Sequence, residues 1–205
     1  EMTSYKDKDK VQGMTRNTVT ELNQAGEYSA MVKVQSFDKK GKETYSSKGV
    51  LFMRTEIDFL GSVELDDSTY YGISTYRAFH NFNVSNELVN MSIIKELVNV
   101  KKQAALTNLK LKFLDKDIAE AIIKACDLIM EGKYNDSFVV NRYQGGAGTS
   151  TNMNVNEVIA NVALELLGKN LGDYDFLHPI NHVNLHQSTN DVFPTAVKIA
   201  SIKQI

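Results

Sequence analysis

Cysteine is nearly absent from this sequence, which holds only Cys126 among 205 residues. A single cysteine cannot form a disulfide within the chain, so a fold stapled by internal disulfides is excluded. Its neighbours are apolar and include Ile122, Ala125 and Ile129. This setting is typical of a small buried hydrophobic side chain, and it favours that interpretation over a reactive thiol.

Long hydrophobic runs and an excess of one charge are also missing. Every apolar run is broken well short of the roughly 18 residues that span a bilayer, and the first residues are charged rather than signal-like. The formal net charge of -2 gives no reason to expect nucleic acid or an acidic membrane surface as a partner. Because 42% of the residues are hydrophobic, we expect a packed, cytoplasmic globular protein.

Several familiar motifs do not occur. The sequence has no P-loop, no dinucleotide fingerprint and no convincing Ser/His/Asp order, so no cofactor is expected. His178, His182 and His186 recur every fourth residue, a spacing that would align three metal ligands on a helix. Pro179 and the turn-forming Asn181 argue against a helix there, so we expect no metal site.

Residues 1 to 52 differ from the rest in their pattern of apolar and polar residues and form an unassigned N-terminal extension. Apolar and polar positions alternate around Tyr28, Ala30 and Val32, and Asp38-Lys-Lys-Gly41 supplies turn chemistry. This pattern predicts a β-hairpin from about residue 27 to residue 45. A lone hairpin is marginally stable. It therefore packs on the following domain, pairs with another chain, or belongs to a larger β-unit.

The remaining chain is predicted to be mainly α-helical. Residues 54 to 82 show little helical period and are interpreted as extended chain and turns. A long helix is predicted beyond residue 86, to about residue 111, with Lys95, Lys101 and Lys102 on its outer faces. Its apolar stripe consists of Leu88, Met91, Ile94, Val98, Ala105 and Leu109. A second helix is predicted from about residue 115 to Gly132.

Three glycines and many hydroxyl and amide side chains mark the segment Gln144-Gly-Gly-Ala-Gly-Thr-Ser-Thr-Asn-Met-Asn-Val-Asn-Glu157. The glycines permit special backbone angles, and Thr149 to Asn152 are types that cap helix N-termini. An apolar period runs on to Gly168, so the segment predicts an anion-binding helix start. The asparagines at 152, 154, 156 and 161 disfavour a helix interior. Their amides are expected to meet polar partners, either a ligand or neighbouring loops.

A second polar segment, Asn184-Leu-His-Gln-Ser-Thr-Asn-Asp191, repeats this logic. Ser188 to Asp191 are helix N-cap types, and Pro194 suits the first turn of a helix. We predict that this second helix start converges on the first. Neither glycine nor proline ends that helix before Ile205, so we interpret the chain as a fragment of a longer protein.

These two segments, extended to residues 144–161 and 182–195, resemble two blocks of the aspartase/fumarase superfamily, in the same order. Asp58-Phe-Leu-Gly61 and Tyr70-Tyr-Gly-Ile-Ser-Thr-Tyr-Arg-Ala78 are similar to its N-terminal segment. The resemblance covers about residues 53 to 205. Gly145-Gly-Ala-Gly-Thr-Ser150 and Ser188-Thr-Asn190 resemble the aspartase branch, since class II fumarases typically have Thr-Gly-Ser-Gly-Thr-Gln and Ser-Ser-Asn there.

The resemblance implies a mainly α fold with a short β-hairpin region, a homotetramer built on a long-helix bundle, and a dicarboxylate substrate, L-aspartate or fumarate. By resemblance Thr149, Ser188 and Thr189 would clamp a carboxylate, and Asn190 would hold the leaving amino group. Arg77 is a further candidate for supporting the site. The family's catalytic serine lies in a Gly-Ser-Ser-x-Met-Pro segment that these 205 residues lack. No catalytic residue is therefore expected among them.

The predicted domains are the extension at 1–52, a helical domain at 53–186, and the start of the central long-helix domain at 187–205. His178-Pro-Ile-Asn181 departs from the His-Pro-Asn-Asp pattern of the fumarases' accessory anion site, so that site is not carried over. His186 replaces a small residue, and we expect it to point to solvent rather than to perturb the site. A class II fumarate hydratase and a non-catalytic oligomerisation or regulatory module remain the alternatives to an enzyme of the aspartase branch.

Overall fold

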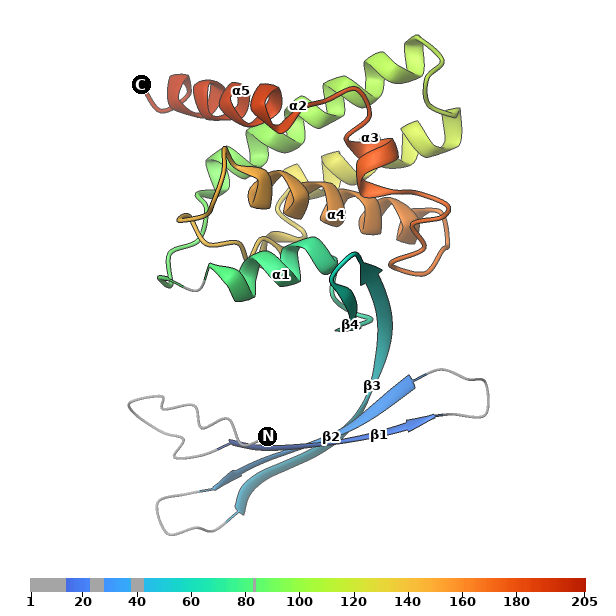
Figure 1. Ribbon diagram of the computed structural model, residues 1–205, viewed down its shortest axis with the longest axis vertical. Helices are drawn as coiled ribbons and strands as arrows, with labels where there is room; N and C mark the ends of the chain where they lie inside the picture. Colours follow the sequence, from blue (N-terminus) through green and yellow to red (C-terminus); the bar gives the residue numbers. More distant parts are fainter. Residues whose placement is uncertain (1–13, 23–27, 38–42, 83) are drawn as a thin grey trace. The chain divides into compact units, whose positions relative to one another are not determined.

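The computed structural model describes residues 14–22, 28–37, 43–82 and 84–205. The chain divides into two compact units, one made of Glu1–Thr55 with Ser62–Ser68 and the other of Glu56–Gly61 with Thr69–Ile205. The described part of the first unit is formed by β-strands, and the second is mainly helical (Figure 1). The division predicted at residue 186 stays a prediction.

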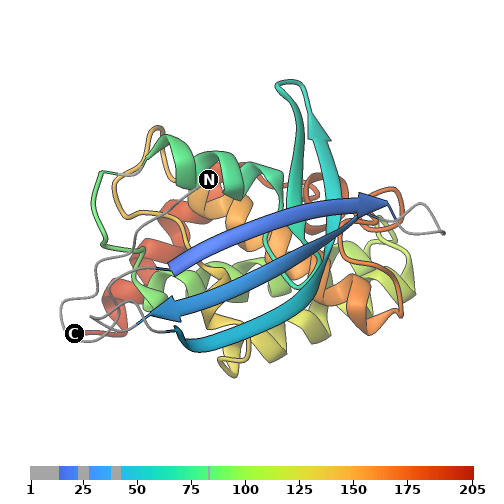
Figure 2. The same ribbon diagram turned by 90° about the horizontal axis from the view of Figure 1, so that it is seen from below.

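Four strands form one sheet in the order β1-β2-β3-β4. They are β1 (Met14–Leu22), β2 (Tyr28–Phe37), β3 (Glu43–Asp58) and β4 (Gly61–Asp66). The first three lie side by side (Figure 2), with β1 antiparallel to β2 and β2 antiparallel to β3. The predicted hairpin is therefore confirmed as the β2–β3 pair, and it belongs to a larger β-unit because β1 extends it.

The helical unit contains α1 (Ile73–Asn81), α2 (Met91–Lys110), α3 (Lys116–Met130), α4 (Thr149–Leu166) and α5 (Thr189–Ile202). Helix α4 is central, since it contacts each of the other four (Figure 1). Its side chains are buried on all faces from Asn154 to Leu164. Leu97 of α2, Ile122 of α3 and Ile159 of α4 belong to one hydrophobic core. The predicted mainly helical fold is confirmed.

The predicted long helix is present as α2, with two differences from the sequence interpretation. It begins after Asn90, whose side chain accepts the N–H of Ser92, so Leu88 lies outside it and bridges to Asn141 instead. Lys101 is fully buried rather than on an outer face. Its position falls in the buried stripe, four residues before Ala105. The second predicted helix is confirmed as α3, and Cys126 within it is fully buried, as expected.

The interpretation of residues 54 to 82 as extended chain and turns is wrong for α1. Its first turn has no acidic residue, and its N-cap, Gly72, has no side chain to cap it. The cap comes from α4, because Glu157 accepts the backbone N–H groups of Gly72 at 2.9 Å, Ser74 at 2.8 Å and Thr75 at 3.1 Å. A cap 83 residues away along the chain leaves no local signal.

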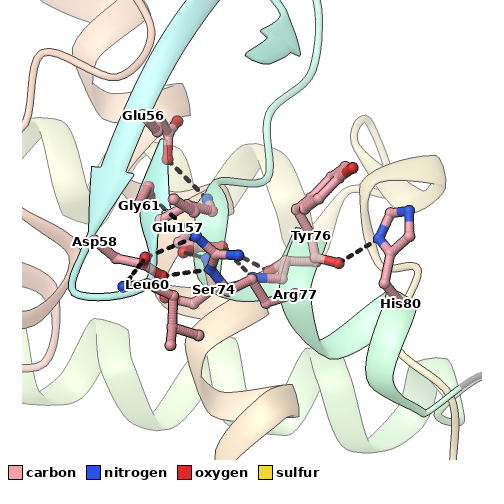
Figure 3. Close-up of polar contacts among 11 residues, drawn as sticks. Glu56, Asp58, Leu60, Gly61, Ser74, Tyr76, Arg77, His80 and Glu157 are labelled. Atoms are coloured by element: carbon pink, nitrogen blue, oxygen red, sulfur yellow. Dashed lines mark hydrogen bonds and ion pairs between the residues drawn. The ribbon is translucent and has the colours of Figure 1, made fainter. Parts of the chain in front are cut away.

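Glu56 completes this arrangement by accepting the N–H of Ile73 at 2.7 Å, and Figure 3 shows both carboxylates at the start of α1. A Cβ on Gly72 would lie 2.8 Å from a Glu56 oxygen and 2.9 Å from Glu157 Cδ, so only glycine fits between them. Burial raises the pKa of Glu157; the hydroxyl of Thr75 opposes that rise, and Glu56 adds to it. Glu157 therefore ties α1 to the central helix, and Glu56 ties it to the end of β3.

The helical turns around Pro179 and Pro194 differ from the sequence prediction. Residues Pro179–Val183 form a single π-helical turn, where the sequence predicted no helix. Pro194 lies inside α5 rather than in its first turn, since Ser188 is the N-cap. Because proline has no N–H, the carbonyl oxygen of Asn190 does not receive the usual hydrogen bond from the residue four positions on.

Candidate functional site

The glycine-rich turn before α4 is held between two aromatic rings. Gly146 and Gly148 have φ angles of 74° and 90°, in the left-handed region that favours glycine. A Cβ on Gly148 would lie 2.4 Å from the Phe193 ring of α5. A Cβ on Gly145 would lie 3.0 Å from the ring of Phe82, the C-cap of α1. The turn needs glycine both for its backbone angles and for the close approach of these rings.

The start of α4 is capped by Gln144, not by the hydroxyl run that the sequence suggested. The side-chain oxygen of Gln144 accepts the N–H of Thr151 at 3.0 Å, and its amide nitrogen donates to the Thr151 hydroxyl at 2.7 Å. Gly148 occupies the N-cap position. The described structure gives no hydrogen-bond partner to the N–H groups of Thr149 and Ser150. Two donors at the positive end of the helix dipole are thus available to an anion.

A cavity of about 360 Å³ lies where the two polar segments meet. Its lining residues are Arg142, Gln144, Gly146, Ala147, Gly148, Asn190, Phe193 and Pro194. The first five belong to the glycine-rich turn and the residues leading into it, and the last three to α5. Arg142 is the one charged residue in this lining, and its guanidinium forms an ion pair with Glu87. The predicted convergence of the two helix starts is therefore present.

The four predicted substrate-binding residues surround this meeting point in different ways. Asn190 lines the cavity. Thr189 is joined to α4, because its hydroxyl accepts the amide of Asn152 at 3.1 Å. Thr149 is the exposed first residue of α4, and Ser188 is the exposed N-cap of α5. These last three are near in sequence to lining residues but are not among them.

Arg77 lies apart from these residues, on α1 (Figure 3). Its guanidinium forms two hydrogen bonds to Asp58, at 2.6 and 2.8 Å, and a third to the carbonyl of Gly61 at 3.0 Å. Hydrogen bonding to Arg77 lowers the pKa of Asp58. The observed contacts of Arg77 therefore fasten the β3–β4 turn to α1, and it does not line the cavity.

The asparagines of α4 meet polar partners, as expected, and most of these partners belong to neighbouring loops. Asn154 donates to the carbonyl of Ser137 at 3.0 Å, and Asn161 donates to the carbonyl of Tyr70 at 2.8 Å. Asn152 and Asn156 both donate to Asn184, and their own side-chain oxygens are buried without a partner.

Sequence reasoning missed a buried polar cluster behind the second segment. We define the Lys101 cluster as Lys101, Asn152, Asn156, Asn184, Gln187 and Thr189. The Lys101 ammonium donates to the side-chain oxygens of Asn184 at 3.0 Å and Gln187 at 3.2 Å. Burial lowers the pKa of Lys101 to about 7. The sequence signal for this burial was the position of Lys101 in the apolar stripe of α2, four residues before Ala105.

His178 and His182 form hydrogen bonds within their own segment, and His186 lies beside Asn108 of α2. Nδ1 of His178 accepts the N–H of Ile180, and Nδ1 of His182 accepts the N–H of His178. Burial lowers the pKa of both rings. His186 is exposed, as expected, with a φ of 60° and its Nδ1 3.1 Å from the side-chain oxygen of Asn108.

Two kinds of feature are absent from the described residues, a cluster of metal ligands and a membrane-spanning helix. Residues 14–22, 28–37, 43–82 and 84–205 contain no group of three or more His, Cys, Asp or Glu side chains placed to hold a metal ion. None of the helices in the described part of the chain combines the length and apolar character that a membrane crossing requires.

Comparison with known proteins assigns the family. The sequence signature of a family described as lyase matches residues 61–205, which include both polar segments. The chain belongs to this lyase family. The match begins close to the predicted boundary of the family-like region and leaves β1, β2 and β3 outside it.

Individual lyases match over the same region. An aspartate ammonia-lyase of Helicobacter pylori is 52% identical over 155 residues, which cover 75% of this chain and 33% of that protein. A class II fumarate hydratase of Wigglesworthia glossinidia brevipalpis is 50% identical over 153 residues, with 75% and 33% covered. The structure of fumarate lyase:delta crystallin from Brucella melitensis in native form is similar with a TM-score of 0.72 at 49% identity, covering 73% of this chain and 35% of that one. The chain spans about a third of the length of the curated relatives it matches.

The ring of Phe193 against the glycine-rich turn of this lyase chain gives a direct test of the site's geometry. We expect Gly148→Ala to lower the thermal midpoint of unfolding by more than Gly168→Ala does. Both glycines have positive φ, but a Cβ on Gly168 meets nothing within 4 Å, whereas one on Gly148 meets the Phe193 ring. The control isolates the backbone strain of about 1–2 kcal/mol. Equal midpoints for the two variants would contradict the close contact.

Proposed function

We propose that this lyase chain is part of an aspartate ammonia-lyase, which converts L-aspartate to fumarate and ammonia. The observation that carries the proposal is the meeting of two polar helix starts at one cavity, with Asn190 on one side and the turn that opens α4 on the other. Such a site offers hydrogen-bond donors that are fixed before the substrate arrives. Donors of this kind suit an anion whose charge increases during reaction.

The reaction requires this kind of stabilisation. A base removes a proton from the carbon beside the β-carboxylate, and the electron pair moves into that carboxylate, which becomes an aci-carboxylate dianion. The dianion then returns the pair to form the carbon–carbon double bond, the carbon–nitrogen bond breaks, and ammonia leaves with the bonding electrons. Hydroxyls and helix N–H groups stabilise the dianion without having to change their own protonation state.

The proposed roles follow from the positions of the residues. Thr149, Ser188 and Thr189 lie at the first turns of α4 and α5 and bind the β-carboxylate. Asn190 lines the cavity and holds the amino group. Arg77 is not given a direct role, because its guanidinium is bonded to Asp58 and Gly61. We further propose that the base and the remaining substrate contacts come from outside these 205 residues, in a homotetramer whose sites combine three subunits.

Hydration of fumarate is the second candidate. It is favoured by the class II fumarate hydratase that is 50% identical to this chain, an identity close to the 52% of the Helicobacter pylori aspartate ammonia-lyase. Overall similarity therefore does not separate the two reactions. We favour the ammonia-lyase because Gly145-Gly-Ala-Gly-Thr-Ser150 and Ser188-Thr-Asn190 resemble the aspartase blocks.

The test is a direct assay of the complete protein that carries these residues. Fumarate is followed by its ultraviolet absorbance, first from L-aspartate and then from L-malate. We expect formation from L-aspartate and little from L-malate. The opposite preference would support the fumarate hydratase, and no turnover of either would contradict both. The 205-residue chain alone is the control and is expected to be inactive. A coding frame without a Gly-Ser-Ser-x-Met-Pro segment beyond Ile205 would contradict the proposal before any assay.

A further inference from the structure

Lys101 carries its amino group in a place where burial disfavours the charged form. Its side chain is fully buried between α2 and the loop that leads into α5. Its two hydrogen-bond acceptors, on Asn184 and Gln187, are neutral amides. The acidic group that affects its pKa is the Cys126 thiol, whose own pKa burial raises to about 12, so that the thiol is neutral at physiological pH. A buried charge without a counter-ion lowers stability.

The contacts of this ammonium all lead toward the proposed substrate-binding residues. The side-chain oxygen of Asn184 accepts from Lys101 of α2 at 3.0 Å and from Asn152 and Asn156 of α4 at 3.1 and 3.2 Å. A carbonyl oxygen has two lone pairs, so three donors compete for it, and the Lys101 amino group forms the shortest of the three bonds. Lys101 therefore fixes the orientation of the Asn184 amide.

The orientation of the Asn184 amide fixes the backbone of the loop between Val183 and Ser188 through side-chain to backbone hydrogen bonds. The amide nitrogen of Asn184 donates to the carbonyl of Gln187 at 2.9 Å, and the Gln187 amide nitrogen donates to the carbonyl of Val183 at 2.8 Å. These two bonds close the turn that ends at Ser188, the N-cap of α5. The Lys101 cluster also reaches Thr189 directly, through the 3.1 Å bond from Asn152. The loop conformation and the register of Ser188 to Asn190 thus depend on the hydrogen bonds of one buried amino group.

We propose that Lys101 is a positioning residue for the site: its buried amino group holds the 184–187 turn so that Ser188, Thr189 and Asn190 face the substrate. The inference rests on the proposed function for its consequence in turnover, but not for the structural effect on the loop. Lys101 itself is buried behind these residues and does not touch the substrate. The buried amino group is kept for the geometry of the site at the expense of stability.

Lys101→Met in the complete protein tests this, because methionine has a similar length and no charge. We expect kcat/KM for L-aspartate to fall about tenfold, since small misplacements of binding groups slow reactions strongly. The thermal midpoint is expected to stay equal or to rise. The matched control is Lys102→Met, which removes the neighbouring charge and its 2.6 Å ion pair with Asp127 without touching the cluster. The control is expected to keep wild-type kcat/KM.

Amide hydrogen exchange supplies a readout that does not depend on turnover. In Lys101→Met we expect faster exchange in residues 184–190 and unchanged exchange in α3. Wild-type kcat/KM together with unchanged exchange would overturn the proposal, as would a loss of activity accompanied by a lower midpoint and faster exchange throughout the helical unit. If the wild-type protein does not act on L-aspartate, the proposed function fails while the exchange result still decides the positioning role. Gln187→Leu, which removes one acceptor of the ammonium, is the second variant if Lys101→Met does not fold.

Discussion

Ser188→Ala is expected to lower kcat for L-aspartate about 100-fold or more in the complete protein, which is the scale of losing one donor to a developing oxyanion. The same loss is expected for Thr149→Ala. Ser188 is exposed at the N-cap of α5, and Thr149 is the exposed first residue of α4. Both hydroxyls can thus donate a hydrogen bond to a bound carboxylate. Ultraviolet detection of fumarate at saturating substrate measures the effect.

Ser188 also has a structural role that the experiment must separate from catalysis. Its hydroxyl oxygen accepts the N–H of Asn190 at 3.2 Å, so alanine removes a helix cap worth about 1 kcal/mol. Glycine caps nearly as well as serine, so Ser188→Gly should keep the stability and still lose the activity. Ser201→Ala is the matched control on the same helix, where the hydroxyl donates to the carbonyl of Val197 at 2.8 Å and does not line the cavity. Wild-type turnover in Ser188→Gly would remove this hydroxyl from the mechanism.

Glu157→Ala is expected to produce the largest loss of stability, about 3 kcal/mol or more of the free energy of unfolding. The carboxylate is 2% exposed and accepts three backbone N–H groups and the Thr75 hydroxyl, the last at 2.6 Å. Alanine would leave these donors buried without partners at the start of α1. Urea unfolding of the complete protein measures the effect as a lower midpoint concentration.

Two further variants define the cause of that loss. Glu157→Gln keeps the volume and one acceptor oxygen, so it should destabilise less than alanine. Glu120→Ala is the matched control, because Glu120 is exposed and its ion pair with Lys116 is long, at 3.8 Å. That change should alter the free energy by less than about 0.5 kcal/mol. A midpoint for Glu157→Ala equal to that of Glu120→Ala would show that α1 does not depend on this carboxylate.

Destabilising α1 should also disturb the glycine-rich turn of the candidate site. Helix α1 ends at its C-cap, Phe82, whose ring lies against the glycine-rich turn at Gly145. Glu157 thus connects the central helix, through α1, to the opposite side of the same turn that Phe193 contacts. Its substitution is therefore expected to raise KM for L-aspartate as well as to lower stability.

The sequence by itself determined the features whose causes are local. Helices α2, α3 and α4 follow from apolar residues that recur with helical spacing, and the β2–β3 pair follows from a two-residue alternation on both sides of a turn. The two polar segments were recognisable because their residue types, at fixed spacing along a short stretch, suit helix starts. Each of these patterns is complete within about 20 residues of the chain.

The tertiary structure decided what depends on contacts between distant segments. Helix α1 is stabilised by Glu157, Lys101 is buried against Asn184, and the glycine-rich turn is fixed by Phe193 of α5. In each case the partners are tens of residues apart, so no local periodicity or capping pattern records the contact. The two segments were predicted to be anion-binding helix starts from their own residues. Only folding brings them to one cavity, because helix packing alone sets the position of α5 against the start of α4.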